Sequence, residues 1–238
     1  YRYDALGRRI GKSVGQSHAG GALRLDKNAE VTRFVWHGER LIQETTGENV
    51  RIYLYQPARD GAVGYAPLAC VDRRRRDDGT FSEMHVYYYQ TDLAGTAVAL
   101  TDEAGKLVWS GRYKAWGQVI PWTQLATPVR QPLRFAGQYL DDETGLHLNG
   151  RRYYDPDVGR YLRPDRSAPA GVSPYRYVSS PLSVANPNGR AVSLRRPKED
   201  VDGPSCADGP IDLSTRWTGG IDERDVMSGD EWLAWLDR

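Results

Sequence analysis

The chain has 238 residues, of which 39% are hydrophobic and 26% are charged, and its formal net charge is +1. These values are ordinary for a soluble chain with room for one large domain, or one domain and a tail. No stretch is long enough to span a membrane, no signal-peptide core is visible, and two cysteines, Cys70 and Cys206, make neither a disulfide framework nor a four-ligand zinc site.

Charge and aromatic residues divide the chain unevenly. Residues 191–238 contain 6 Lys/Arg and 11 Asp/Glu, a net charge of −5, whereas residues 1–190 carry +6. The acidic end therefore reads as a separate segment, and it is a poor binder of nucleic acid because phosphate needs positive charge. The aromatic residues are 15 Tyr, 7 Trp and 3 Phe. Tyr and Trp favour sheet faces that are partly solvated.

The first 165 residues predict β-strands joined by tight turns. Residues 1–14 read as a hairpin, and residues 32–43 read as another around His37-Gly38. Further strands are expected at residues 51–56, 84–90, 97–101, 106–113, 118–122 and within 133–165, with loops at 15–30 and 58–69. No useful helical period occurs in this part. The fold class is therefore all-β, built from antiparallel hairpins.

One turn pattern recurs along these strands. An Asp follows a predicted strand, which bears tyrosine in most cases, and a Gly closes the turn three residues later, as type I turns prefer. The Asp/Gly pairs are 4/7, 92/95, 102/105 and 142/145, with a longer version at 155/159. Such recurrence indicates a repeat array whose units bury their faces on one another.

A charged hairpin tip is expected after the predicted loop at 58–69. Arg73 to Arg76 are followed by Asp77, Asp78 and Gly79. A run of arginines can bind phosphate, but a solvated loop with local pairing to the two aspartates is the simpler interpretation.

The remaining residues change character twice. Residues 166–190 are rich in Pro, Ser and Gly and are expected to be irregular, with Tyr175 and Tyr177 able to dock on the sheet. Residues 191–238 are expected to begin as a linker and to end in one short helix at 229–237. Ser228 and Glu231 would form its capping box, ahead of an apolar run of Trp and Leu.

Two long motifs resemble the C-terminal core of the RHS/YD-repeat family. They are YYQTDLAGTAVALTDEAGKLVWSGRYKAWG at 88–117 and RFAGQYLDDETGLHLNGRRYYDPDVGRYLRPD at 134–165. The resemblance implies repeats that coil into a hollow shell, sealed at one end by the core segment. It divides the chain into a repeat core at 1–165, a core-closing segment at 166–190 and a variable acidic tail at 191–238.

The resemblance also implies a self-cleavage reaction, for which this chain is poorly equipped. Many family members carry two Asp-Pro-x-Gly-Leu motifs whose aspartates act as an aspartic-protease pair. Asp165 stands at the first position without the Pro-x-Gly-Leu that should follow, and Asn186 replaces the second aspartate. The neighbouring Arg166 would keep Asp165 ionised. If cleavage persisted, it would fall between Arg190 and Ala191. Whether the chain is an enzyme therefore stays open, with a non-cleaving chain favoured and both residues read as turn residues.

Other chemistry finds little support in the sequence. His18, His37, His85 and His147 lack ligand spacing, so no metal and no cofactor are expected. The sequence contains no G-x-S-x-G, and neither cysteine has a histidine nearby in the chain. Tyrosine and tryptophan ladders could stack on sugars, although cross-strand pairing that stabilises the sheet is the simpler role.

The expected function is a structural shell segment of an RHS toxin used in bacterial competition. Alternatives are a tail that is itself a small toxin enzyme, or a surface carbohydrate-binding module. The resemblance implies upstream RHS repeats as partners, with a secretion spike protein and an immunity protein. It also implies a chain that is cytoplasmic in bacteria before it is secreted or injected. Because the sequence starts inside a repeat, any export signal is expected upstream.

Overall fold

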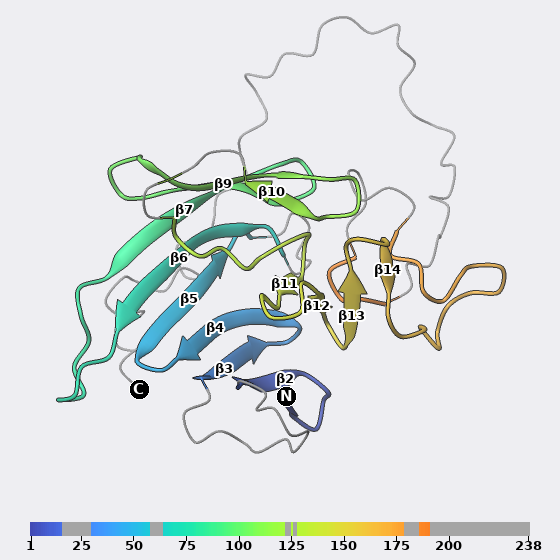
Figure 1. Ribbon diagram of the computed structural model, residues 1–238, viewed down its shortest axis with the longest axis horizontal. Coiled ribbons are helices and arrows are strands. Elements are labelled where there is room, and N and C mark those ends of the chain that lie inside the picture. The colour runs from blue at the N-terminus through green and yellow to red at the C-terminus, as the bar shows by residue number, and fades with distance from the viewer. Residues whose placement is uncertain (16–29, 58–63, 122–124, 126–127, 179–185, 191–238) are drawn as a thin grey trace, which may run out of the picture. The chain divides into compact units, whose positions relative to one another are not determined.

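The computed structural model describes residues 1–15, 30–57, 64–121, 125, 128–178 and 186–190 (Figure 1). In this part of the chain all regular structure is β-sheet, as predicted, and every strand pair is antiparallel. No helix there has the length and apolar character needed to cross a membrane. The predicted helix at 229–237 and the whole tail lie outside the described residues.

The larger sheet has ten strands in sequence order, so each strand pairs with the next along the chain. Its strands are β1 (Arg2–Tyr3), β2 (Arg9–Val14), β3 (Glu30–His37), β4 (Arg40–Thr46), β5 (Asn49–Tyr55), β6 (Pro67–Arg74), β7 (His85–Thr91), β8 (Ala97–Thr101), β9 (Leu107–Tyr113) and β10 (Val119–Pro121). The smaller sheet has four, namely β11 (Gln138–Leu140), β12 (His147–Asn149), β13 (Arg152–Asp155) and β14 (Arg160–Tyr161). The predicted strands agree with these to within a few residues at their ends, except that β6 was not predicted. The prediction of a loop up to residue 69 is wrong, because Pro67–Ala69 begin β6 and pair with β5.

The Asp-x-x-Gly turns share one hydrogen-bond pattern, which explains the recurrence in the sequence. In the first turn the Gly7 amide donates to the Asp4 carbonyl, and the Asp4 carboxylate accepts from the amides of Leu6 and Arg8. The turns opened by Asp92 and Asp102 repeat these contacts. Each closing glycine has a φ of about +80°, a left-handed backbone that side chains disfavour.

The prediction that Asp142 opens the turn that Gly145 closes is wrong. The Gly145 amide donates to the carbonyl of Asp141, so this turn has the longer spacing that Asp155 and Gly159 also show. Asp142 is exposed and pairs with Arg130 at the surface. Two adjacent aspartates make the register ambiguous in the sequence, and packing decides it because Asp141 is fully buried.

The predicted pairing of arginines with aspartates at the β6–β7 tip is also wrong. Among the described residues no ion pair joins Arg73–Arg76 to Asp77 or Asp78. Asp78 instead accepts hydrogen bonds from the amide and hydroxyl of Thr80, and the Arg73 guanidinium lies 4.0 Å from the centroid of the Phe81 ring. The tip is solvated, as predicted.

The smaller sheet closes the larger one by contacting both of its ends. At the β10 end, Tyr154 donates a hydrogen bond to the Trp116 carbonyl and Gln118 donates to Asp157. At the β1 end, the hydroxyls of Tyr3 and Tyr153 are 3.3 Å apart. Tyr139 on β11 packs edge-on against Phe34 in between, within a core that Leu41, Tyr53, Tyr89 and Leu100 complete.

A buried ion pair joins the first hairpin to the segment that opens the smaller sheet. Arg9 Nη1 donates to Asp141 Oδ2 over 2.5 Å, and both side chains are fully shielded from solvent. The guanidinium carbon of Arg9 also lies 4.7 Å from the Phe34 ring centroid and 5.5 Å from that of Tyr139. The electron-rich faces of these rings attract the guanidinium charge. Two Arg9 nitrogens, Nε and Nη2, find no hydrogen-bond partner within the described part of the chain. Lys12 adds a contact of 2.9 Å with Glu143.

Replacing Asp141 should therefore cost far more stability than replacing its neighbour. Asp141→Asn leaves the buried Arg9 charge without its counter-ion, which costs about 3 kcal/mol or more. Asp142→Asn removes only an exposed pair and should cost less than about 1 kcal/mol. Urea unfolding of the two variants measures the difference. Equal losses would contradict the assignment of Asp141 as the buried partner.

Candidate functional site

The sequence places the candidate site around Asp165 and Asn186, and the structure seats residues 186–190 tightly against the smaller sheet. Backbone meets backbone at three glycines. A Cβ added to Gly137 would lie 2.1 Å from the Pro187 carbonyl oxygen, one on Gly150 would lie 2.5 Å from that of Asn188, and one on Gly189 would lie 2.3 Å from that of Asn149. No real Cβ is tolerated at such distances, so these positions require glycine.

Side chains fix the same segment from several elements. Arg152 on β13 donates from Nε to the Gly189 carbonyl at 2.5 Å and from Nη1 to the Pro174 carbonyl at 3.1 Å. The Tyr65 hydroxyl, from the loop before β6, donates to Asn188 Oδ1 at 2.6 Å. The segment is thus held by both the larger and the smaller sheet.

Asn186 is buried, with 4% of its surface exposed. Its Nδ2 lies 3.4 Å from the Tyr161 hydroxyl and 3.5 Å from the Tyr177 carbonyl oxygen, both of which can accept a hydrogen bond. Its carbonyl accepts from the Gly189 amide at 3.2 Å, which closes a turn through Pro187. Asn186 is therefore a turn residue, as predicted, and its side chain is also buried against Tyr161 and Tyr177.

Asp165 has a partner that the sequence did not reveal. Its Oδ2 lies 3.4 Å from Nη2 of Arg152, and its Oδ1 accepts hydrogen bonds from the amide and hydroxyl of Ser167. Arg166, which was predicted to hold Asp165 ionised, is exposed. Asp165 forms its ion pair with Arg152, a buried residue that strand alternation turns inward.

Arg152 and Tyr161 bring the two predicted residues into one neighbourhood. The Arg152 guanidinium carbon lies 3.6 Å from the Tyr161 ring centroid, and it contacts Asp165 on one side while Asn186 contacts the Tyr161 hydroxyl on the other. Tyr161 in turn donates to Asn149 Oδ1 at 2.8 Å. Arg152, Tyr161 and Asn149 were missed because no turn or motif signal marks them. Arg190 is exposed at the end of the described segment, and Ala191 lies outside it.

An aromatic cluster packs around Arg152 and Asn186 and shields them from solvent. Tyr154, Tyr161 and Tyr177 pack with ring centroids 4.9 to 5.9 Å apart, next to Phe135. Burial raises the pKa of each of these tyrosines well above its ordinary value, so each phenol keeps its proton. Tyr177 was correctly predicted to dock, whereas Tyr175 is exposed.

The arrangement binds a chain segment but lacks a group that could exchange protons at position 186. An amide neither gives nor accepts a proton as a carboxyl group does, and the neighbouring phenols stay neutral. No group of three or more candidate metal ligands occurs among the described residues. Burial raises the pKa of the Cys70 thiol to about 11, which leaves it protonated.

His147 lies beside the site as a buried neutral residue. Its Nδ1–H donates to Gln138 Oε1 at 2.8 Å, and its ring packs on Tyr154. Burial lowers the pKa of His147 to about 3, and the Arg134 charge acts in the same direction. His147 therefore does not titrate in the folded chain near neutral pH, and no ligand role was predicted for it.

A second recess lies over strands β2–β6 and has a volume of about 730 Å³. Much of its charge is already paired, Arg51 with Asp72, Lys12 with Glu143 and Arg130 with Asp142. Glu30, Arg73 and Arg74 also line it. The one aromatic side chain that lines it, Tyr139, is buried and bonded to Glu44. Nothing in this recess offers the exposed aromatic platform that sugar stacking uses, so the carbohydrate hypothesis gains no support here.

Residues 86–122 match the family model described as RHS protein. The chain is also 39% identical over 203 residues to double-stranded DNA deaminase toxin A of Burkholderia cenocepacia, covering 81% of this chain and 14% of that protein. It is 32% identical over 219 residues to toxin protein Tse5 of Pseudomonas aeruginosa, covering 82% of this chain and 15% of that protein.

The chain belongs to the RHS-repeat family. Its fold is similar to a chain in the crystal structure of TcdB2-TccC3-Cdc42, with a TM-score of 0.56 and 22% identity over 80% of this chain and 9% of that one. The predicted family, the all-β shell fold and a kinship with RHS toxins are thus confirmed. This RHS segment spans about one seventh of the length of the two toxins above.

The close approach at Gly150 predicts a large effect of a single methyl group. Gly150 and Gly47 have nearly equal φ values, +57° and +56°, but an added Cβ at Gly47 meets nothing within 4 Å. Gly47→Ala should cost about 1 kcal/mol of stability from backbone strain alone. Gly150→Ala should cost clearly more and should expose residues 186–190 to limited proteolysis. Equal stability losses with unchanged digestion would contradict a tight seat.

Burial of neutral His147 predicts a loss of stability in mild acid. Between about pH 6.5 and pH 3 the unfolded chain binds a proton at His147 that the folded chain does not bind, so the free energy of unfolding falls as the pH decreases. The slope approaches about 1.4 kcal/mol per pH unit below pH 6.5 and vanishes above it. Urea unfolding at several pH values measures this slope. His147→Gln should flatten it, and an unchanged slope in that variant would contradict the assignment.

Proposed function

We propose that this chain is the closing part of an RHS shell and that its work is structural. The supporting observation is the seat of residues 186–190. Their backbone packs closely against the smaller sheet, Arg152 binds the Gly189 carbonyl, and Tyr65 binds the Asn188 side chain. A segment held this way anchors whatever follows it in the chain. The chain then falls into a repeat core at 1–165, a closing segment at 166–190 and a tail at 191–238 that the closing segment presents.

The biological setting follows from the relatives. Two RHS relatives are named as toxins of bacteria, and each is several times longer than this chain. By analogy this segment works within a longer polypeptide, with further RHS repeats before it, in bacterial competition. A secretion spike protein and an immunity protein are the partners proposed for that setting, with the chain made in the cytoplasm and then secreted or injected.

The structure supports a shell that does not cut itself by an aspartyl pair. Asp165 is ion-paired with Arg152, and Asn186 offers an amide where the second carboxyl group would stand. An aspartyl pair needs one carboxyl group to accept a proton from water and the other to donate one, and the amide of Asn186 can do neither, so the pair is incomplete. The tail then stays covalently joined to its seat.

Intact-mass spectrometry of the purified chain tests this proposal. The parent chain should remain whole at 26.7 kDa during prolonged incubation. Asn186→Asp restores a carboxyl group at the buried position and should release a fragment that begins at Ala191. The double variant Asp165→Asn with Asn186→Asp is the control and should stay whole.

Two results would count against the proposal. A parent chain cut after Arg190 would show that Asn186 does not block the reaction. An Asn186→Asp variant that stays whole would show that this amide is not the group on which cleavage depends.

A further inference from the structure

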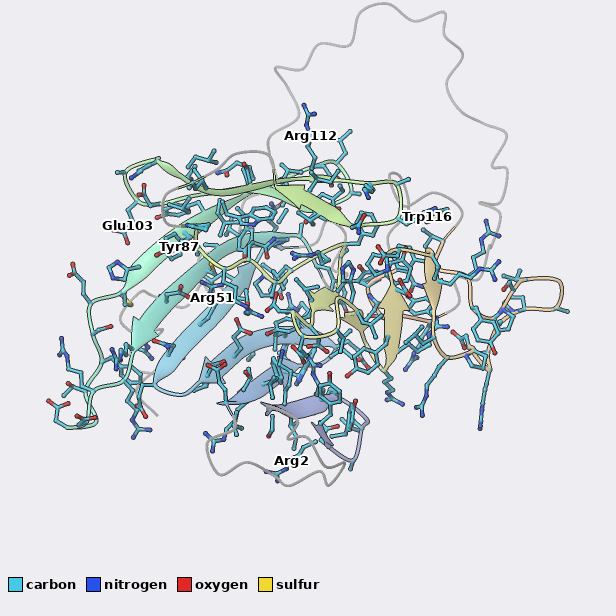
Figure 2. All side chains as sticks on the ribbon, in the orientation of Figure 1. Arg2, Arg51, Tyr87, Glu103, Arg112 and Trp116 are labelled. Atoms are coloured by element: carbon cyan, nitrogen blue, oxygen red, sulfur yellow. The ribbon has the colours of Figure 1, made fainter. Side chains whose placement is uncertain are left out.

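The surface around β14 is strongly basic. Residues 147–190 contain 7 Arg and 3 Asp, a net charge of +4, although the whole chain carries +1. Arg152 is buried, and the other six are exposed; together they define the arginine surface, namely Arg151, Arg160, Arg163, Arg166, Arg176 and Arg190. Figure 2 shows long nitrogen-tipped side chains extending from this part of the chain into solvent.

Strand pairing forces two of these charges together. Arg160 on β14 and Arg176 form an antiparallel bridge, so their side chains lie on the same side of the backbone. Like charges placed directly opposite each other destabilise a sheet. An arrangement of this kind is stabilised by an anion that binds both guanidinium groups.

Acidic neighbours do not neutralise the arginine surface. Asp155 lies opposite Arg160 in the β13–β14 register, but the two form no ion pair. Asp157 accepts a hydrogen bond from Gln118. Within the described residues none of the six arginines forms an ion pair with an acidic side chain, so their charges face solvent.

Exposed apolar side chains lie among these arginines. Val158 and Leu162 are 62% and 52% exposed, and Tyr175 is 40% exposed. Trp116, also 40% exposed, lies over Gly159 in the turn before β14. Leu162 directly follows β14 and is two residues from Arg160 in the chain.

We propose that the arginine surface binds the anionic face of a phospholipid membrane. Basic side chains are attracted by the negative headgroups, while Tyr and Trp favour the interface and aliphatic side chains enter its apolar edge. Nucleic acid would also satisfy the arginines, but it gains from aromatic stacking and offers no apolar phase to Leu162 and Val158. The combination of the two side-chain classes therefore favours a lipid surface.

Vesicle co-sedimentation of the full 238-residue chain tests this surface. Binding to phosphatidylcholine vesicles containing about 30% phosphatidylserine should exceed binding to pure phosphatidylcholine at least tenfold and should weaken with salt. Replacing Arg160, Arg163, Arg166 and Arg176 by Gln should reduce the partition coefficient about 100-fold or more, because each basic residue near the surface contributes about fivefold.

The chain offers a matched control with the same change in charge. Four other arginines are also exposed but lie far from the arginine surface in the sequence. They are Arg33 on β3, Arg74 at the end of β6, and Arg75 and Arg76 in the β6–β7 tip. Replacing these four by Gln should reduce vesicle binding only a few-fold. Leu162→Ser keeps all the charges and should weaken binding about tenfold at high salt, where apolar insertion dominates.

Each other outcome overturns the proposal. Equal losses in the two four-fold variants would show that net charge alone drives binding. Binding that ignores phosphatidylserine, or Leu162→Ser binding like the parent at high salt, would exclude the lipid interface. If duplex DNA displaces the chain from vesicles at equal phosphate concentration, and the variant lacking Arg160, Arg163, Arg166 and Arg176 loses DNA binding as it loses vesicle binding, this surface is a nucleic-acid site. Circular dichroism confirms that every variant is folded.

Discussion

The buried pair of Arg9 and Asp141 is the contact on which the closure of this fold depends. It joins residues 132 positions apart in the sequence, one in the first hairpin and one in the β11–β12 turn of the smaller sheet. A fully buried ion pair adds little net stability, because both charges lose their hydration. Its value here is specificity, since Asp141 is compensated only when the first hairpin has arrived. Phe34 and Tyr139 complete the environment by facing the guanidinium.

The contact between the two sheets also fixes the surface against which residues 186–190 pack. The smaller sheet presents Gly137, Gly150 and Arg152 to this segment, and its aromatic rings bury Asn186. The side chains around the segment hold it in place. Tyr161 holds Asn186 and Asn149, while Arg152 spans Asp165 and Gly189. In the proposed function, the amide at position 186 is one reason why this site holds the segment and does not cut it.

Local rules allowed much of this fold to be predicted, and long-range packing explains the rest. The Asp-x-x-Gly turns depend on contacts within four residues, so Asp4, Asp92 and Asp102 were recognisable from the sequence. The choice between Asp141 and Asp142 depends on Arg9, which no local pattern reveals. Likewise Asp165 and Asn186 could be found because they stand at the positions of a family motif. Arg152 could not, because the sequence does not show which of Arg151 and Arg152 is buried, and the pairing of Arg152 with Asn149 decides it.

Native-state hydrogen exchange measures most directly whether the two sheets close as one unit. If the Arg9–Asp141 contact couples them, the slowest amides of β2, β12 and β13 should exchange with the same free energy, equal to that of global unfolding. Residues 186–190 should share that protection. Exchange of β12 and β13 at a distinctly lower free energy, while β2 to β6 stay protected, would show that the smaller sheet opens independently and would contradict the account.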